Sequence, residues 1–432
     1  MNVAVVGGGW AGLAAAIEAV RGGHRVTVFE AARQWGGRAR ALEVPLDDGG
    51  TVTLDNGQHI LIGAYRETLA LMRAVGIEPR EVLRRLPLTL RFPDGQGLVL
   101  PEAPAPLDAA WGILGARGWT WTDKLSLLKH AAGWQLRRFQ CDDSLTVSAL
   151  CEGLAPTVMR DLVDPLCVAA LNIPAGRASA SVLLRVLRDG LFGPSQDGWG
   201  ASNLLLPARD LGTLFPEAAA AWLQAKGASL RLGHRVQSLS RDGEGWAVDG
   251  ERFGSVLLAA PPWEAERLVA ESAAPTGDWL AQVRSLAHEP IATVYVQDGP
   301  ALPLPMLALH SAPDAPAQFV FDRAQLGGPP GVLAFVISAS EGGVQELETR
   351  VLAQAGALGW RVRPLKTVVE KRATFACVPS LRRPGIDVAP GLFACGDYVD
   401  GPYPATLEGA VRAAQAAAAR LNPAARTAPS AS

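Results

Sequence analysis

The chain of 432 residues carries 40 basic and 42 acidic residues and a formal net charge of −2, which argues against a general nucleic-acid-binding surface. This length exceeds what one hydrophobic core usually holds, so we expect two domains, and no apolar run of about 18 residues is free of charges, so we expect no transmembrane helix. Five cysteines without a Cys-x-x-Cys pair and six histidines without ligand spacing predict neither a disulfide framework nor a metal site.

The first forty residues predict a strand, a glycine-rich turn and a helix. The apolar run from Val3 to Val6 leads directly into Gly7-Gly8-Gly9-Trp10-Ala11-Gly12, which leaves no room for a signal peptide and favours a cytoplasmic protein. In this Gly-x-Gly-x-x-Gly pattern the glycines allow a tight turn, a close approach to a pyrophosphate and close helix packing. A second predicted strand ends on Glu30, which can accept both hydroxyl protons of an adenosine ribose. The stretch predicts a dinucleotide site formed by the following residues: Gly7, Gly9, Trp10, Ala11, Gly12, Glu30 and Ala31.

A second glycine pair follows at Gly36-Gly37-Arg38, and a predicted strand then leads into Asn56-Gly57-Gln58-His59. Alone, the glycine pair would be read as a surface turn. After the fingerprint, however, the combination resembles the flavin amine oxidase and phytoene desaturase superfamily. The resemblance implies FAD as cofactor, with a second backbone approach and an arginine near the phosphates. It adds these expected contacts: Gly36, Gly37, Arg38, Asn56, Gly57, Gln58 and His59.

The segment from Tyr65 to Gly76 has helical spacing and ends on glycine. Together with the loop before it, it resembles the hydroxysqualene dehydroxylases of bacterial hopanoid gene clusters, a likeness that extends to near residue 420. Packing within the loop would explain His59 and Tyr65 equally well.

Residues 111 to 139 hold four of the twelve tryptophans. Within a predicted helix from Lys124 to Phe139, Leu125, Leu128 and Leu136 share one stripe, whereas Leu127 and Trp134 lie opposite. The pattern fits a helix packed on both sides. It also fits an interfacial helix with apolar groups in lipid and basic groups at the headgroups.

The middle of the chain predicts helices over 158–171 and 178–191, a helix over 215–224, and a β-meander that closes at Ala260. The superfamily resemblance implies that Val236 and Ala260 lie near the adenine and the pyrophosphate. Four closely spaced strand candidates between 291 and 338 predict an antiparallel sheet.

Near the C-terminus, a strand ends on Gly396-Asp397, and a short loop with Ala405 and Thr406 precedes an alanine-rich helix. This arrangement resembles the second flavin signature of the superfamily, in which Asp397 bonds the ribityl side and the helix N-terminus faces the pyrimidine edge. The tail from Asn422 to Ser432 is expected to be disordered.

These patterns predict an α/β protein: a Rossmann-like FAD-binding domain of the glutathione-reductase type, with an inserted α+β substrate domain that has an antiparallel sheet and a helical cover. We assign 1–86, 205–265 and 365–432 to the FAD-binding domain, and 87–204 and 266–364 to the substrate domain.

The hydroxysqualene dehydroxylase resemblance implies reductive removal of the hydroxyl of hydroxysqualene to give squalene, with hydride from the N5 of reduced FAD. It implies an unidentified electron donor and possible contact with the membrane surface. Isoprenoid desaturation remains open, as do amine oxidation and a noncatalytic FAD-binding subunit. Hydroxide is a poor leaving group, so a proton donor is needed. The sequence does not choose among five candidates: His59, Tyr65, Asp164, Tyr398 and Tyr403.

Overall fold

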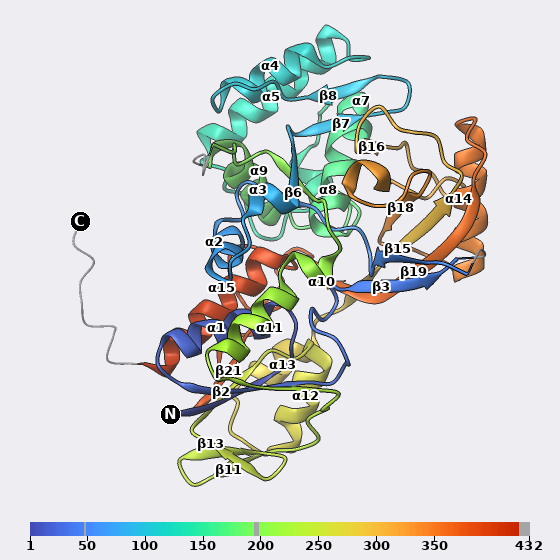
Figure 1. The fold of residues 1–432 in the computed structure, drawn as a ribbon. Coiled ribbons are helices and arrows are strands. Elements are labelled where there is room, and N and C mark those ends of the chain that lie inside the picture. The colour runs from blue at the N-terminus through green and yellow to red at the C-terminus, as the bar shows by residue number, and fades with distance from the viewer. Residues whose placement is uncertain (47–48, 194–197, 423–432) are drawn as a thin grey trace.

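The computed structural model describes residues 1–46, 49–193 and 198–422 (Figure 1). The C-terminal tail expected to be disordered lies outside this range from residue 423 onward.

A six-stranded sheet in the order β10-β2-β1-β14-β21-β20 forms the base of the molecule. All neighbouring pairs are parallel except β20 and β21. The continuous run of apolar residues from Val3 to Val6, like those of the neighbouring strands, suits strands that are covered on both faces. The strand bounds are β1 Asn2–Val6, β2 Arg25–Glu30, β10 Ser229–Leu232, β14 Ser255–Leu258, β20 Asp387–Ala389 and β21 Leu392–Ala394.

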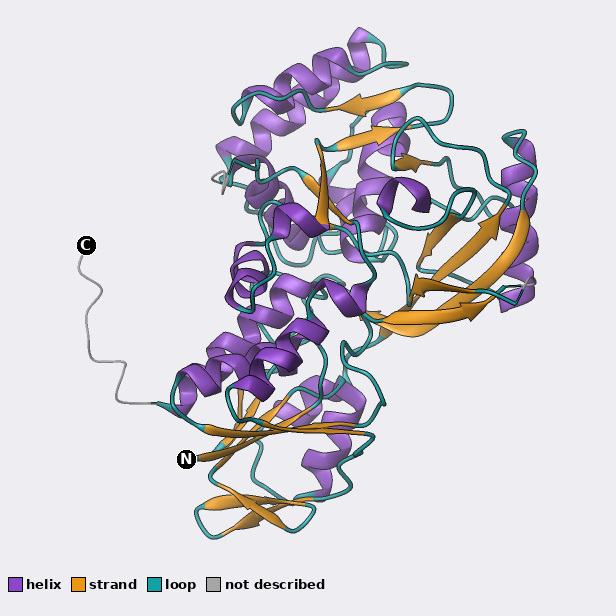
Figure 2. Cartoon of the chain, in the orientation of Figure 1, coloured by secondary structure: helices purple, strands orange, loops and turns teal. Residues whose placement is uncertain are grey.

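Helices α1, α11 and α15 cover one face of this sheet, and a small antiparallel meander with α12 and α13 lies beyond the other (Figures 1 and 2). Both helices are rich in alanine, and these small side chains allow the helices to approach closely. Leu13 and Ile17 of α1 are therefore fully buried beneath α15. The bounds are α1 Trp10–Arg21, α11 Pro216–Ala225, α15 Leu407–Ala418, β11 Leu239–Asp242, β12 Gly245–Val248, β13 Glu251–Phe253, α12 Pro262–Glu271 and α13 Trp279–Arg284.

The expected antiparallel sheet has five strands in the order β16-β17-β18-β15-β19, with α14 packed against one face. Its elements are β15 His288–Gln297, β16 Met306–Ala308, β17 Phe319–Asp322, β18 Leu333–Ser338, α14 Val344–Ala357 and β19 Arg363–Phe375.

One expected domain boundary moves. Residue 365 falls inside β19, which pairs with β15 along its whole length and so belongs to the antiparallel sheet. Five charged residues and a proline at its second position weakened the strand signal in the sequence. The chain therefore returns to the six-stranded sheet only after Phe375, and we keep the rest of the domain division as a proposal.

Short strands and helices join the two sheets and cover the space between them (Figure 2). The strands are β3 Ala41–Pro45, β4 Thr51–Asp55, β5 Leu61–Ile62, β6 Leu83–Leu86, β7 Thr89–Arg91, β8 Gly97–Val99 and β9 Leu204–Pro207. The helices are α2 Arg66–Ala74, α3 Pro79–Val82, α4 Leu107–Gly115, α5 Trp121–Leu136, α6 Val147–Leu150, α7 Pro156–Val158, a π-helical turn Met159–Val163, α8 Asp164–Leu171, α9 Ala180–Phe192 and α10 Leu211–Leu214, with 3₁₀ turns at Arg323–Leu326 and Ala419–Leu421. In the described part of the chain, no helix has the length and apolar character needed to cross a membrane.

Helix α5 buries one of its two tryptophans and exposes the other, Trp121, at its start. Leu127 and Trp134 are buried, whereas Leu125 is 61% and Leu136 is 86% exposed. Leu128, which shares a stripe with these two leucines, is half-buried and packs against the core, so the stripe is exposed only at Leu125 and Leu136.

Candidate functional site

A cavity of about 660 Å³ lies between the two sheets and collects the residues expected to bind the cofactor. It is lined by all of them but one: Gly7, Gly9, Trp10, Ala11, Glu30, Ala31, Gly36, Gly37, Arg38, Asn56, Gly57, Gln58, His59, Val236, Ala260, Gly396, Asp397, Ala405 and Thr406. The exception is Gly12, whose predicted role was packing.

The glycines of the first turn have distinct steric roles. Gly7 has a φ of +113°, and a Cβ there would lie 2.5 Å from the carbonyl oxygen of Ala259. A Cβ on Gly12 would lie 1.8 Å from the oxygen of Gly7, so this glycine lets α1 contact the strand. At Gly9 a Cβ would meet no protein atom closer than 3.6 Å, because this side of the turn faces the cavity.

The N-terminus of α1 is suited to bind a phosphate. Its N-cap residue Gly9 provides no side-chain hydrogen bond, and the first turn contains no acidic residue. The amide groups of that turn therefore lack a side-chain partner and face the cavity beside the glycine turn. This arrangement fits the pyrophosphate of FAD.

Glu30 is held at the end of β2 by two main-chain amides. Gly8 donates to its Oε2 at 2.6 Å, and Ala32 donates to its Oε1 at 2.7 Å. These bonds fix the carboxylate at the cavity wall and leave oxygen lone pairs for ribose hydroxyls.

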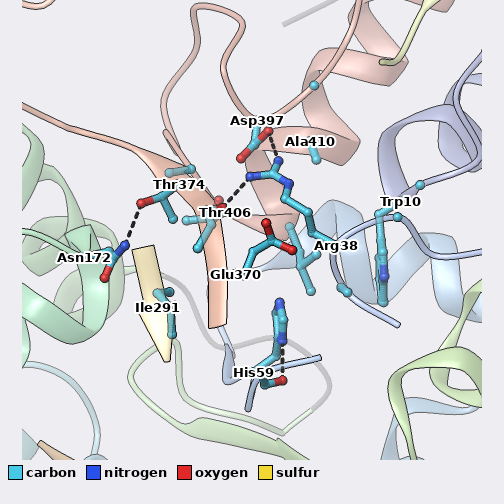
Figure 3. A pocket seen from close by; sticks show the side chains of 18 of the residues that line it. Trp10, Arg38, His59, Asn172, Ile291, Glu370, Thr374, Asp397, Thr406 and Ala410 are labelled. Carbon is cyan, nitrogen blue, oxygen red and sulfur yellow. Dashed lines mark hydrogen bonds and ion pairs between the residues drawn. The ribbon is translucent and has the colours of Figure 1, made fainter. Parts of the chain in front are cut away.

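The second glycine pair packs directly on the first. Gly36 donates its amide to the oxygen of Gly8 at 3.0 Å. This contact brings Arg38 to the cavity, where its Nη2 lies 2.6 Å from Oδ1 of Asp397, a residue 359 positions away in the sequence (Figure 3). Arg38 also donates to the oxygen of Ala373. The arginine and the aspartate of the two flavin signatures thus form one ion pair.

The loop before α15 bears on the expectation that the amides at the N-terminus of this helix are free to face the flavin. The Thr406 hydroxyl donates to the oxygen of Tyr403 at 2.9 Å and accepts from the amide of Gly409 at 3.0 Å. One amide of the first helical turn is therefore already capped, and Thr406 lines the cavity with its hydroxyl engaged in the loop. Ala405 has a φ of +56°, a left-handed conformation that a non-glycine residue adopts at a cost of about 1 kcal/mol.

The Asn56 to His59 loop is held from behind by a buried charge cluster. Asp55 is fully buried, with its Oδ1 accepting the amide of Leu211 at 2.8 Å and its Oδ2 3.4 Å from Arg323. Arg323 also donates to Oε1 of Gln58 at 3.0 Å. Because burial disfavours the charged form, the pKa of Asp55 rises to about 6 despite the nearby arginine.

Of the five candidate proton donors, His59, Tyr65, Tyr398 and Tyr403 line the cavity. Figure 3 shows His59 among the lining residues. Asp164 does not line the cavity: it is exposed at the start of α8. The cavity is reached instead by Leu166 and the last turn of that helix. Asp164 therefore cannot serve as the proton donor in this cavity, because it points to a different side of the helix from the residues that line it.

Three acidic residues that the sequence did not single out also line the cavity: Asp189 of α9, Glu264 of α12 and Glu370 of β19. Asp189 follows Arg188 near the end of α9, and Glu370 lies two residues after Val368, on the same face of its strand. An acidic residue on the inward face of a helix or strand would have indicated a cavity-lining position. For Glu370 this signal was missed because β19 was not recognised as a strand.

The remaining wall of the cavity is apolar. The side chains come mainly from α8, α9 and the antiparallel sheet: Leu88, Leu166, Val168, Val182, Val186, Leu187, Leu191, Ile291, Phe319, Phe321, Val336 and Val368. No lysine lines it among the described residues. Nor do the described residues contain a group of three or more His, Cys, Asp or Glu that could hold a metal ion.

Comparison with known proteins matches residues 10–422 to the family model described as flavin containing amine oxidoreductase. A hydroxysqualene dehydroxylase of Sinorhizobium fredii is 28% identical over 440 residues, covering 96% of this chain and 97% of that protein. A 15-cis-phytoene desaturase of Synechococcus elongatus is 31% identical over 197 residues, covering 43% of this chain and 41% of that protein. The crystal structure of an oxidoreductase from Methanosarcina mazei superimposes with a TM-score of 0.72 at 17% identity, covering 96% and 99% of the two chains, which supports the fold.

Proposed function

The chain belongs to the flavin containing amine oxidoreductase family, and from this premise we propose that it is an FAD-dependent enzyme that converts hydroxysqualene to squalene. FAD is its cofactor. The proposal is supported by similarity to the Sinorhizobium fredii hydroxysqualene dehydroxylase along nearly the whole of both chains.

The observation that carries the proposal is the continuity of the flavin site with a large apolar chamber. Leucine and valine side chains of α8 and α9 face the antiparallel sheet across the same cavity that the glycine turns enter. Such a wall suits a long hydrocarbon and gains free energy mainly by removing apolar surface from water.

When bound and reduced, FAD supplies a hydride. The chain supports that chemistry in two ways. The glycine turns, Glu30 and the Arg38–Asp397 pair bind and orient the cofactor. The apolar wall keeps bulk water from a carbon that becomes positively charged as the hydroxyl leaves.

The alternatives fit less well. Amine oxidation commonly uses a lysine-bound water, and no lysine lines the cavity among the described residues. Isoprenoid desaturation would use the same chamber, but it would reduce the oxidised flavin instead of oxidising the reduced flavin. An experiment that follows the redox state of the flavin therefore distinguishes the two reactions. A single dinucleotide fingerprint implies that a separate donor reduces the flavin.

We further propose that α4 and α5 contact the surface of an anionic membrane. Six of the ten large apolar side chains that are exposed in the described chain lie on these two helices: Leu107, Trp111, Leu114, Trp121, Leu125 and Leu136. Lys124 and Lys129 flank the α5 stripe, and the acidic Asp123 is buried in the capping box of the helix. Tryptophan and lysine beside an apolar stripe are typical of an interfacial helix.

This face lies close to the proposed substrate chamber. Phe139, shortly after α5, packs on Phe192 at the end of α9 with ring centroids 5.1 Å apart. Leu187 and Leu191 of the same helix line the cavity. A substrate that leaves the bilayer at α5 would therefore meet α9 next.

An anaerobic single-turnover experiment tests the reaction. The bound flavin is reduced with dithionite, hydroxysqualene is added in detergent micelles, and flavin absorbance and product are followed together. We expect squalene to form in step with flavin reoxidation. A reduced flavin that stays reduced, beside oxidised enzyme that introduces double bonds into squalene, would establish the desaturase alternative instead.

A further inference from the structure

Removal of a hydroxyl needs an acid within reach of the leaving oxygen, and this inference rests on the proposed function because it concerns that step. The protic side chains that line the cavity differ in whether they can release a proton.

His59 is poorly suited to donate. Its Nδ1 lies 3.0 Å from the carbonyl oxygen of Gly57, which can only accept, so Nδ1 carries the proton and Nε2 is the acceptor. Burial lowers the pKa of His59, and the nearby Arg38 lowers it further. The neutral ring therefore presents a lone pair at its free nitrogen.

The three tyrosines hold their protons tightly. Burial raises the pKa of Tyr65 and of Tyr398, and it raises the pKa of Tyr403 to about 12 with help from the charge of Asp189. Tyr398 is also almost entirely enclosed.

Asp189 is held as a carboxylate. Nε of Arg185 lies 3.1 Å from its Oδ2, and Nε of Arg188 lies 2.8 Å from its Oδ1. Burial acts to raise its pKa, but hydrogen bonds from Arg188 and Tyr403 outweigh burial and bring the pKa below its ordinary value. This carboxylate is an anion at neutral pH, with little tendency to take up a proton.

Glu264 also lines the cavity, but its Oε1 is paired with Nη2 of Arg267 at 2.6 Å. Glu370 differs from all of these groups. Its nearest donors are Nδ2 of Asn56 at 3.3 Å and the amide of Arg372 at 3.5 Å, both long contacts, and no ion pair joins it to a described residue. Figure 3 shows its side chain projecting into the space that Arg38 and His59 also face.

The backbone explains this position. Glu370 lies opposite Ile291 of β15, and Ile291 and Thr293 also line the cavity. Because alternate residues of a strand share a face, Val368 and Glu370 both point to the chamber. Glu370 is thus a half-buried, weakly bonded carboxyl at the boundary between the expected flavin contacts and the apolar wall.

We propose that Glu370 is the acid that protonates the departing hydroxyl of the substrate. The proton of the carboxyl forms an O–H bond on the leaving oxygen as the carbon–oxygen bond breaks and water departs. Hydride from the reduced flavin forms the new C–H bond, so the substrate carbon is reduced and the flavin is oxidised. The carboxylate regains its proton from solvent, and a two-electron donor of the reduced nicotinamide or reduced flavin class restores the flavin.

The test compares wild type with Glu370→Gln, which keeps the size of the side chain and removes the acid. Glu370→Asp keeps the acid on a shorter arm, and Glu341→Gln changes an exposed glutamate away from the cavity. Three measurements are made on each FAD-bound variant: FAD per chain from absorbance, hydroxysqualene affinity of the oxidised enzyme from tryptophan fluorescence, and single-turnover flavin reoxidation after dithionite reduction across pH 5 to 9.

We expect Glu370→Gln to retain FAD and substrate affinity but to react at least about 100-fold more slowly, as loss of a general acid predicts. The wild-type rate should fall as the pH rises, as acid catalysis predicts, whereas the rate of Glu370→Gln should not depend on pH. The other charged or titratable groups near Glu370 in the cavity lining, Arg38, Arg40, Asp397 and His59, remain in every variant. Glu370→Asp should recover part of the rate, and Glu341→Gln should match wild type.

The outcomes separate the two proposals. A wild-type enzyme that is not reoxidised by hydroxysqualene overturns the proposed function. A wild type that reacts, with Glu370→Gln within about twofold of it, overturns only the role of Glu370. Loss of FAD in both Glu370→Gln and Glu370→Asp overturns that role too, by showing that the residue holds the cofactor site together.

Discussion

At the scale of single residues, the cavity depends on side chains that are missing as much as on those that are present. Gly7 and Gly12 are required by the protein itself, because a Cβ at either position would overlap backbone atoms. Gly9 is different, since its free side faces only the cavity. Gly7 therefore makes the turn, Gly12 lets α1 pack against it, and Gly9 keeps open the expected place of the pyrophosphate.

Replacing Gly9 by leucine should give a folded protein without FAD. Its backbone has an ordinary extended conformation with a φ of −77°, and a Cβ there meets no protein atom within 3.4 Å, so folding should survive. The side chain would occupy the place of the pyrophosphate. Circular dichroism and the flavin absorbance per chain measure the two effects.

The matched control is Gly356→Leu, which makes the same change in α14, where a Cβ also has open space. It should keep its FAD. Full flavin occupancy in the folded Gly9 variant would contradict the assignment of the turn.

The buried Asp55 predicts a pH dependence of stability. Burial raises its folded pKa to about 6, above the ordinary value of 3.8, so the folded state favours the protonated form. The stabilisation is present below pH 4 and is lost as pH rises to 6. The free energy of unfolding of wild type relative to Asp55→Asn should therefore fall by about 3 kcal/mol between pH 4 and pH 7.

Urea denaturation of the FAD-bound proteins at several pH values measures this difference. Comparing the two proteins cancels the titration of all other groups. A difference that is constant with pH, or that grows as pH rises, would show that Asp55 is charged throughout because Arg323 outweighs burial.

At the scale of elements, α5 shows how a helix with apolar residues on two sides is oriented. Thr120 and Asp123 form a capping box that fixes where the helix begins. Leu127 and Trp134 then face the protein, whereas Trp121, Leu125 and Leu136 are exposed. These exposed side chains remain available for a membrane.

Replacing Leu125 and Leu136 by glutamate should weaken binding to liposomes that contain anionic lipid by at least about tenfold. Both side chains are exposed, so folding and single-turnover activity in detergent should not change. Flotation at low and high salt measures the binding, and the contribution of Lys124 and Lys129 should appear as loss of binding at high salt.

The control replaces Leu232 and Leu358, two exposed leucines in other parts of the molecule, by glutamate. It should float like wild type. Equal flotation of all three proteins, or of none, would remove α5 from the membrane proposal.

At the scale of the whole molecule, FAD would join segments that are distant in the sequence. The cavity takes residues from the first forty positions, from four strands of the antiparallel sheet (β15, β17, β18 and β19), and from the loop before α15. The Arg38–Asp397 pair already crosses that distance at 2.6 Å. Binding of FAD to the folded state alone must therefore stabilise the entire fold.

Removal of FAD should lower the thermal midpoint, and returning FAD should raise it in a concentration-dependent way. At free FAD of about 100 times its dissociation constant, the expected gain is about 2.7 kcal/mol. Differential scanning fluorimetry across an FAD series measures it. The Gly9→Leu protein is the control, and a midpoint that rises equally in that variant would point to FAD binding elsewhere.

The sequence by itself determined the cofactor half of this protein. Gly7, Gly9, Glu30 and Gly36-Gly37-Arg38 could be recognised because a turn, a strand end and a helix start are local structures set by neighbouring residues. The tertiary structure decided the rest. It brought Glu370 and Asp189 into the cavity, left Asp164 outside, and exposed Leu125 and Leu136 of α5. Those outcomes depend on which face of an element packs against a distant partner, and neighbouring residues in the sequence do not fix that choice.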